Sequence, residues 1–243
     1  MSFDYKNIDY PIRDDLIKAY REAWRRLARP GSWWTGAERI TIAAETKNAF
    51  VCALCRRRKD PISTYPVEGK HEHLNLLPYA AIDVIHRVIT DKESITRKWV
   101  DGIGLSDGHY VELLGIVVMV FSIDEFNRAI GAPLEPLPDP DPGAPSHYRP
   151  PNLETDTGFI PMIQDGGNTG KEADLWNKGR TGNVIRAMSL VPDAVRDLML
   201  LGDVQYIPHE EIMAMKADAG RAINRMQIEL VAGRVSAMNQ CFY

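Results

Sequence analysis

The sequence lacks the features that mark several large classes of protein. Its three cysteines among 243 residues are too few, and odd in number, for a disulfide scaffold. Basic residues do not outnumber acidic ones, and a net charge of −4 gives no positive field that would attract nucleic acid. The first residues also lack the charged and apolar segments of a signal peptide. We therefore expect a cytoplasmic protein that does not bind nucleic acid.

Long apolar runs and strand patterns are missing as well. The longest apolar stretch, residues 113–123, is too short to span a bilayer and contains Gly115 and Ser122. No convincing period-two alternation predicts a strand, whereas apolar side chains recur with helical period from residue 16 to residue 27. With 44% apolar residues available for a core, the sequence predicts an all-α protein without a membrane segment.

Proline, scarce elsewhere, is concentrated in one segment. Eight of the sixteen prolines lie between Pro133 and Pro151, which favours an extended connector that either spans two domains or wraps the first one. The predicted organisation is a helical domain at residues 1–132, a linker at 133–157 and a second helical unit at 158–243.

Helix boundaries are signalled by capping residues. Thr35, with Glu38 three residues on, predicts the start of a helix that runs towards the cysteines, and Asp60-Pro61 ends it or its continuation. Pro78 opens another helix, and Ser106 caps a long one at about 107–130. Helical patterns are predicted at residues 184–201 and 208–219. A last helix begins near Asn224 and reaches the final residue without a cap, which suggests a continuation.

Cys52 and Cys55 form the one strong chemical signature. Two cysteines three residues apart on a helix share a face and can form a disulfide. Lys47 and the basic run at residues 56–59 favour the thiolate form, which is the nucleophile in thiol chemistry. We predict a redox-active dithiol whose sulfurs are reached by solvent and have lowered pKa values.

Proton transfer to the departing oxygen or sulfur requires an acid–base group near the thiols. Glu45 precedes Cys52 by seven residues, which is about two turns if the helix is continuous. His71 and His73 are further options in a loop, whereas His86 and His109 are interpreted as structural. The predicted catalytic residues are Cys52, Cys55, Glu45 and His71, with no bound cofactor or metal.

Two other interpretations of the cysteines remain open. A Cys-x-x-Cys pair followed by His-x-His is also a possible zinc-ligand set, which would hold the loop at residues 60–75 in place. Alternatively, the two cysteines are small buried apolar residues without any reactivity.

Near its end the chain resembles a known family. Residues 227–243 are similar to the segment that leads into the Cys-x-x-Cys motif of AhpD-type alkylhydroperoxidases, a branch of the carboxymuconolactone decarboxylase-like superfamily. Glu229 and Cys241 keep the twelve-residue interval between the family's glutamate and its first cysteine. The second cysteine and the following histidine of the motif would fall beyond Tyr243.

The first half looks like a diverged copy of the same unit. Residues 42–55 set Cys52 in the place of Cys241, and residues 104–131 are similar to the family's closing helix. Ile40 and Lys59 depart from the family's glutamate and histidine. A proton relay would then have to be rebuilt from other groups, for which the candidates are Glu45, Glu38, Glu112, His71 and His73.

The resemblance implies a cofactor-free, homo-oligomeric antioxidant enzyme built as an AhpD-like helical bundle with two related halves. One thiolate, by family resemblance that of Cys55, attacks a hydroperoxide to give a sulfenic acid, and Cys52 resolves it to a disulfide. A thioredoxin-like or lipoyl reductant closes the cycle. The alternatives are a non-redox decarboxylase-like enzyme, which binds a small organic acid near Trp33, Glu45 and His71, and a zinc-stabilised structural module.

Overall fold

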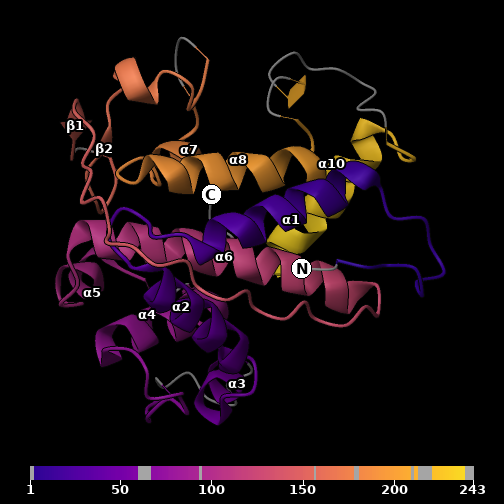
Figure 1. The fold of residues 1–243 in the computed structure, drawn as a ribbon, viewed down its shortest axis with the longest axis horizontal. Helices are drawn as coiled ribbons and strands as arrows, with labels where there is room; N and C mark the ends of the chain where they lie inside the picture. The colour runs from indigo at the N-terminus through magenta and orange to yellow at the C-terminus, as the bar shows by residue number, and fades with distance from the viewer. Residues whose placement is uncertain are drawn as a thin grey trace.

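The structure is a computed structural model, and its described residues are mainly helical (Figure 1). It describes residues 3–59, 67–92, 95–155, 157–177, 181–208, 211–212 and 221–238. The longer helices are α1 (Asp14–Ala28), α2 (Gly36–Ala49), α4 (Tyr79–Thr90), α6 (Asp107–Ala129), α8 (Pro192–Gln205) and α10 (Arg225–Met238). The shorter ones are α3 (Ala53–Lys59), α5 (Arg97–Asp101), the 3-10 turn η2 (Gly170–Glu172) and α7 (Asn183–Arg186). The predicted dominance of helix is confirmed.

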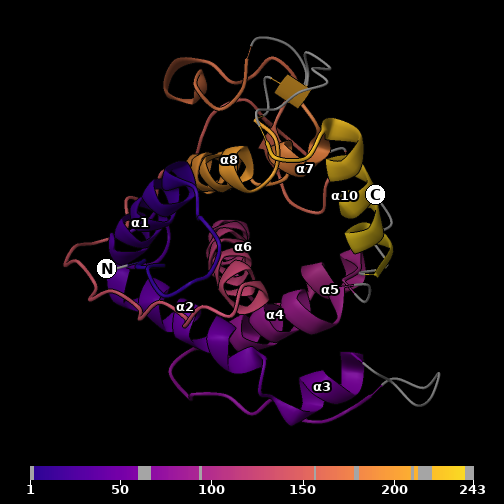
Figure 2. The same cartoon turned by 90° about the vertical axis from the view of Figure 1, so that its right-hand side faces the viewer.

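The main core lies around α6, which packs against α2, α4 and α8, while α1 packs against α2 and α8. Figures 1 and 2 show α8 on one side of α6 and the α2–α4 pair on the other. Leu190 and Leu201, from the second predicted unit, are buried in the same cluster as Trp24 and Ile123 from the first. The two units therefore share one core across the proline-rich segment.

Local sequence signals explain where two central helices begin. The Thr35 side chain accepts a hydrogen bond from the backbone N–H of Glu38, whose carboxylate binds the Thr35 backbone N–H in return. Ser106 accepts from the backbone N–H of His109 at the start of α6. Both caps satisfy backbone donors that an uncapped helix leaves without a partner, and both predicted starts are confirmed.

The proline-rich segment runs over the first helices. The backbone N–H of Asp141 donates to the carbonyl of Ala28 at 2.8 Å, and that of Ser146 donates to Gly31 at 3.1 Å. Gly36, in α2, lies so close to the Asp141 carbonyl that an added Cβ would stand 2.6 Å from it. The segment therefore wraps the helices, which is one of the two predicted arrangements.

Two features of the second unit differ from expectation. Leu153–Glu154 (β1) and Met162–Ile163 (β2) form a two-stranded antiparallel ladder that no alternation pattern predicted. The helical pattern at residues 184–201 is divided into α7 and α8, with Pro192 in the first turn of α8. Most of the helical pattern predicted at 208–219, together with Cys241 and the Asp60-Pro61 stop, lies outside the described residues.

Within the described part of the chain, no helix combines the length and apolar character needed to cross a bilayer. Even α6, the longest, carries the buried acidic side chains of Glu112 and Asp124. The prediction that the sequence has no membrane-spanning helix is thus confirmed for the described residues.

Candidate functional site

Cys52 and Cys55 lie at a break between two helices. The helix α2 ends at Ala49, Cys52 follows in the turn, and Cys55 stands in the first turn of α3. The helix predicted to run from Thr35 towards the cysteines therefore ends before it reaches them, and α3 is a separate helix after a break. The alignment of Glu45 with the cysteines on one helical face was expected only for a continuous helix, and because the helix is interrupted it does not occur.

Both cysteines are buried, contrary to the expectation that solvent reaches them. Cys52 and Cys55 are each 0% exposed, and neither forms a disulfide. They belong to a small apolar cluster of their own, with Leu54 and the partly buried Val67. Figures 1 and 2 show α3 at the edge of the molecule, on the side away from α8.

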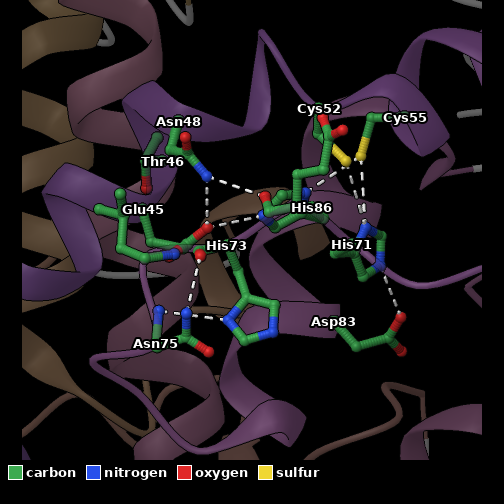
Figure 3. A network of polar contacts seen from close by, with 12 residues as sticks. Glu45, Thr46, Asn48, Cys52, Cys55, His71, His73, Asn75, Asp83 and His86 are labelled. Carbon is green, nitrogen blue, oxygen red and sulfur yellow. Dashed lines mark hydrogen bonds and ion pairs between the residues drawn. The ribbon is translucent and has the colours of Figure 1, made fainter.

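Two histidines converge on the sulfurs (Figure 3). His71 Nδ1 lies 3.8 Å from Cys52 Sγ and 3.5 Å from Cys55 Sγ. His86, on α4, places its Nδ1 3.1 Å from Cys55 Sγ. The four nitrogen and sulfur atoms all lie within 4.8 Å of one another, and all four residues are buried.

Each histidine is held from behind by a carboxylate. His71 Nε2 lies 3.1 Å from Asp83 Oδ1, and His86 Nε2 lies 2.8 Å from Glu45 Oε1. A carboxylate accepts hydrogen bonds, so each Nε2 carries the proton and donates it. Each Nδ1 then presents its lone pair to the sulfurs when the imidazole is neutral.

Glu45 is the best-connected acid of the cluster. Its carboxylate accepts hydrogen bonds from the Asn48 side chain at 3.0 Å, the Leu74 backbone N–H at 2.9 Å and His86. Burial raises the pKa of Glu45, but these three hydrogen bonds outweigh it and keep the pKa below the ordinary value. Glu45 is thus an anion that orients His86 and fixes the loop before α4.

The two thiols differ in acidity. Burial raises the pKa of Cys55 to about 12, contrary to the lowered pKa that the sequence predicted. At Cys52 burial also raises the pKa, but hydrogen bonds from the backbone of Cys55, from His71 and from the backbone of Glu72 lower it overall. Of this pair, Cys52 is the thiol that ionises first.

Burial also keeps His86 neutral. It lowers the pKa of His86 despite the hydrogen bond to Glu45. A neutral imidazole can accept a proton at Nδ1 from the thiol of Cys55 or give its lone pair to a metal ion.

The structure brings together all four predicted site residues, Cys52, Cys55, Glu45 and His71. The hydrogen bonds of His86 show that its interpretation as a structural residue was incomplete. Its signal in the sequence was a histidine on the buried face of α4, next to Ile82 and Ile85, where an imidazole needs polar partners.

The other candidates lie elsewhere. His73 accepts a hydrogen bond from the Asn75 backbone N–H, Glu38 caps α2, and Glu112 pairs with Arg39.

Trp33 packs against His109 and His147, with its backbone N–H bonded to Glu112. The contacts of Trp33 thus do not join it to Glu45 and His71 in the pocket that the decarboxylase alternative requires.

The basic run contributes less than its sequence suggests. Arg56 and Arg57 are exposed, and Arg58 donates to the carbonyl of Val67 at 3.2 Å. Of these, Arg58 is the one whose charge lowers the pKa of Cys55, and burial outweighs it. Burial at Cys55 and hydrogen bonds at Cys52, more than neighbouring cations, therefore set the acidity of the pair.

Comparisons with protein-family models, with curated proteins and with solved structures each found no match for this chain. The function of the site therefore has to follow from its own chemistry. That chemistry consists of two thiols, two imidazoles and two carboxylates in one hydrogen-bonded group, of which only Asp83 is partly exposed.

Proposed function

We propose that the protein is a thiol-dependent oxidoreductase that reduces organic hydroperoxides through a cycle between the Cys52–Cys55 dithiol and its disulfide. The observation that carries the proposal is a pair of hydrogen-bonded chains, one from Asp83 through His71 to Cys52 and one from Glu45 through His86 to Cys55. A carboxylate, an imidazole and a thiol in this order form the arrangement that activates nucleophiles in enzymes.

In the proposed first half-reaction, Cys52 is the attacking residue, because its hydrogen bonds favour the thiolate. This reverses the roles implied by the family resemblance. The sulfur bonds to the terminal oxygen of the hydroperoxide as the O–O bond breaks. His71, which holds the proton that Cys52 gave up, returns it to the leaving alkoxide. The products are an alcohol and the sulfenic acid of Cys52.

In the second half-reaction, Cys55 resolves the sulfenic acid. Its thiol proton passes to His86 Nδ1, while Glu45 stabilises the imidazolium that forms. The sulfur of Cys55 attacks the sulfur of Cys52, hydroxide leaves, and it takes the proton from His86 to become water. The two thiols have lost two electrons, and the O–O bond has accepted them.

The resemblance to AhpD-type alkylhydroperoxidases supports the same reaction, although with the roles of the two cysteines exchanged. We include in the proposal an AhpD-like bundle with two related halves, of which the second contains Glu229 and Cys241. A thioredoxin-like or lipoyl dithiol would reduce the disulfide, and the enzyme would be a homo-oligomer. These parts rest on the sequence alone.

The test is thiol counting in metal-free protein before and after one equivalent of an organic hydroperoxide. A Cys241→Ser background leaves Cys52 and Cys55 as the only thiols. We expect two thiols to disappear and a disulfide to form. In Cys55→Ser, Cys52 should stop at a sulfenic acid, which a dimedone probe traps.

The relay is tested by a matched pair of histidine variants. His86→Asn should slow disulfide formation more than sulfenic acid formation, because His86 serves the resolving thiol. His73→Asn, in the neighbouring loop, should change neither rate. If both thiols of the folded protein stay unreactive towards peroxide, the proposed function is wrong.

A further inference from the structure

The donor atoms around the sulfurs have the spacing of a tetrahedral metal site. Zinc binds cysteine sulfur at about 2.3 Å and histidine nitrogen at about 2.0–2.1 Å, so a tetrahedral site separates sulfur from nitrogen by about 3.5 Å. The observed distances from His71 Nδ1 to the two sulfurs are 3.8 and 3.5 Å, and His86 Nδ1 lies 3.1 Å from Cys55 Sγ. They scatter around the tetrahedral value.

The surroundings of the histidines fit the same role. A histidine that binds a metal usually donates its other ring N–H to a carboxylate, which fixes the ring and makes it a better donor. Here both histidines do so, His71 to Asp83 and His86 to Glu45. Two cysteine thiolates and two neutral imidazoles are a ligand set of structural zinc sites, whereas calcium and magnesium prefer oxygen.

The packing around α3 is a third observation, and it does not depend on the distances between the donor atoms. Among the residues that the structure describes, the apolar cluster at α3 contains Cys52, Leu54 and Cys55, packed against Val67, and is separate from the main core. Of the other helices, α3 packs mainly against α4. So small a cluster provides little hydrophobic stabilisation. A metal that joins α3, the loop at His71 and α4 would supply additional stabilisation.

From these observations we propose that Cys52, Cys55, His71 and His86 bind one Zn²⁺ ion, and that metal binding and disulfide formation exclude each other. The first part rests on these observations and does not depend on the proposed redox function. The second part rests on the proposed redox function, because it requires that peroxide oxidises these thiols.

The exclusion follows from the electron balance. In the metal-bound state both sulfurs are thiolates that share electron pairs with the ion. Two thiolates, one hydroperoxide and two protons yield a disulfide, an alcohol and water, and the sulfurs lose the pairs that held the metal. One Zn²⁺ ion should therefore leave for each disulfide formed, and reduction of the disulfide should restore binding.

Metal binding is tested on the full chain, purified under reducing conditions without added zinc. We expect about one zinc per chain by elemental analysis, as the tetrahedral ligand set predicts. Cobalt(II) bound in its place should show a thiolate charge-transfer band and the intense visible bands of tetrahedral coordination. If reduced protein binds zinc and cobalt no better than the Cys52→Ser/Cys55→Ser variant, the metal site does not exist.

The carboxylates provide variants that leave all four ligands in place. Asp83→Asn should weaken zinc binding by about 10- to 100-fold, the usual effect of losing such a partner. The matched control is Asp91→Asn, at the end of the same helix, where the acid pairs with Arg87. Circular dichroism confirms that both variants are folded. Equal zinc affinity in both would contradict the proposed role of Asp83 as a positioning residue.

The final measurement separates the metal site from the redox function. Peroxide is added to zinc-loaded and to metal-free protein, and released zinc is followed with a chromophoric chelator while thiols are counted. Release of one zinc per two thiols supports both proposals. If peroxide oxidises the thiols but the reduced protein cannot bind zinc, the zinc proposal is wrong. If the protein binds zinc but its thiols never react with peroxide, the redox function and the exclusion are wrong.

Discussion

The helix α2 contributes charged side chains to two buried regions that differ in one respect. Towards α6, Arg39 pairs with Glu112 at 2.5 Å and Lys47 pairs with Asp124 at 2.8 Å, so each charge meets its opposite. Towards α4, Glu45 reaches a group of thiols and imidazoles. We call the first region the ion-pair region and the second, formed by Cys52, Cys55, His71 and His86, the thiol–imidazole cluster.

This difference separates a structural role from a chemical one. Each ion pair has both of its partners within the protein. The attraction between them offsets part of the free energy that the charges lose when they leave water. In the thiol–imidazole cluster four electron-pair donors point at one another, and a proton, a disulfide bond or a cation must relieve their repulsion. Changes in the ion-pair region should therefore affect stability, and changes in the cluster should affect reactivity or metal binding.

The largest effect on stability is expected from Glu112→Ala. This change leaves the buried Arg39 guanidinium without its carboxylate and also removes the acceptor of the Trp33 backbone N–H. Breaking one side of a buried ion pair typically costs about 3–5 kcal/mol of unfolding free energy. Urea unfolding measures the loss, and peroxide should still oxidise the thiols of the folded fraction.

A double variant controls for the loss of charge. Arg39→Met with Glu112→Leu removes both charges and should recover most of the lost stability, because no buried charge is left unpaired. A loss below about 1 kcal/mol in Glu112→Ala would mean that this pair behaves like an exposed one.

The second effect is the stabilisation of the protein by zinc. A ligand that binds only the folded state adds about 4 kcal/mol to the unfolding free energy when its free concentration is about a thousand times its dissociation constant. Reduced protein should therefore unfold at higher urea with buffered zinc than with a chelator. The Cys52→Ser/Cys55→Ser variant should show no such difference, and an equal shift in that variant would place the metal elsewhere.

Much of the ion-pair region's framework could be read from the sequence, because its signals are local. The Thr35–Glu38 capping box and the Ser106 cap lie within three residues of their partners, so the helix starts were predicted correctly. The helix break at residues 50–52 was missed, since the segment between Glu45 and Cys55 contains no glycine or proline.

The thiol–imidazole cluster was harder to predict, because it depends on distant parts of the chain. Cys52, Cys55, Glu45 and His71 were chosen from residue type and spacing, but His86 lies 41 residues from Glu45 and on another helix. No local pattern pairs the two. The burial of the sulfurs was also missed, because the exposed residues Arg56 and Arg57 suggested an exposed segment.

The third prediction concerns Glu45→Gln in metal-free protein. At neutral pH the loss of hydrogen bonds to a charged acceptor should lower the unfolding free energy by about 1.5–3 kcal/mol. The pKa of Glu45 in the folded protein lies below its ordinary value of 4.5, so its contribution is present above that value. It is lost as the pH falls through the folded-state pKa.

The stability gap between wild type and Glu45→Gln should therefore narrow on acidification below pH 4.5, which urea unfolding at several pH values will show. The exposed Glu125, paired with Arg128, supplies the control Glu125→Gln, for which we expect a small effect. A gap that widens at low pH would contradict the role of Glu45 as a buried anion.

The smallest effect is expected from Thr35→Ala, which removes the cap of the helix that serves both regions. Losing such a cap costs about 1 kcal/mol of stability. Thr41→Ala is the matched control, because the Thr41 hydroxyl bonds the Ala37 carbonyl within the helix and does not cap it. Urea unfolding and zinc titration should show that Thr35→Ala lowers stability but leaves zinc affinity unchanged. If zinc affinity falls with stability, the start of α2 and the cluster at its end are coupled through the helix, and the two regions are not independent.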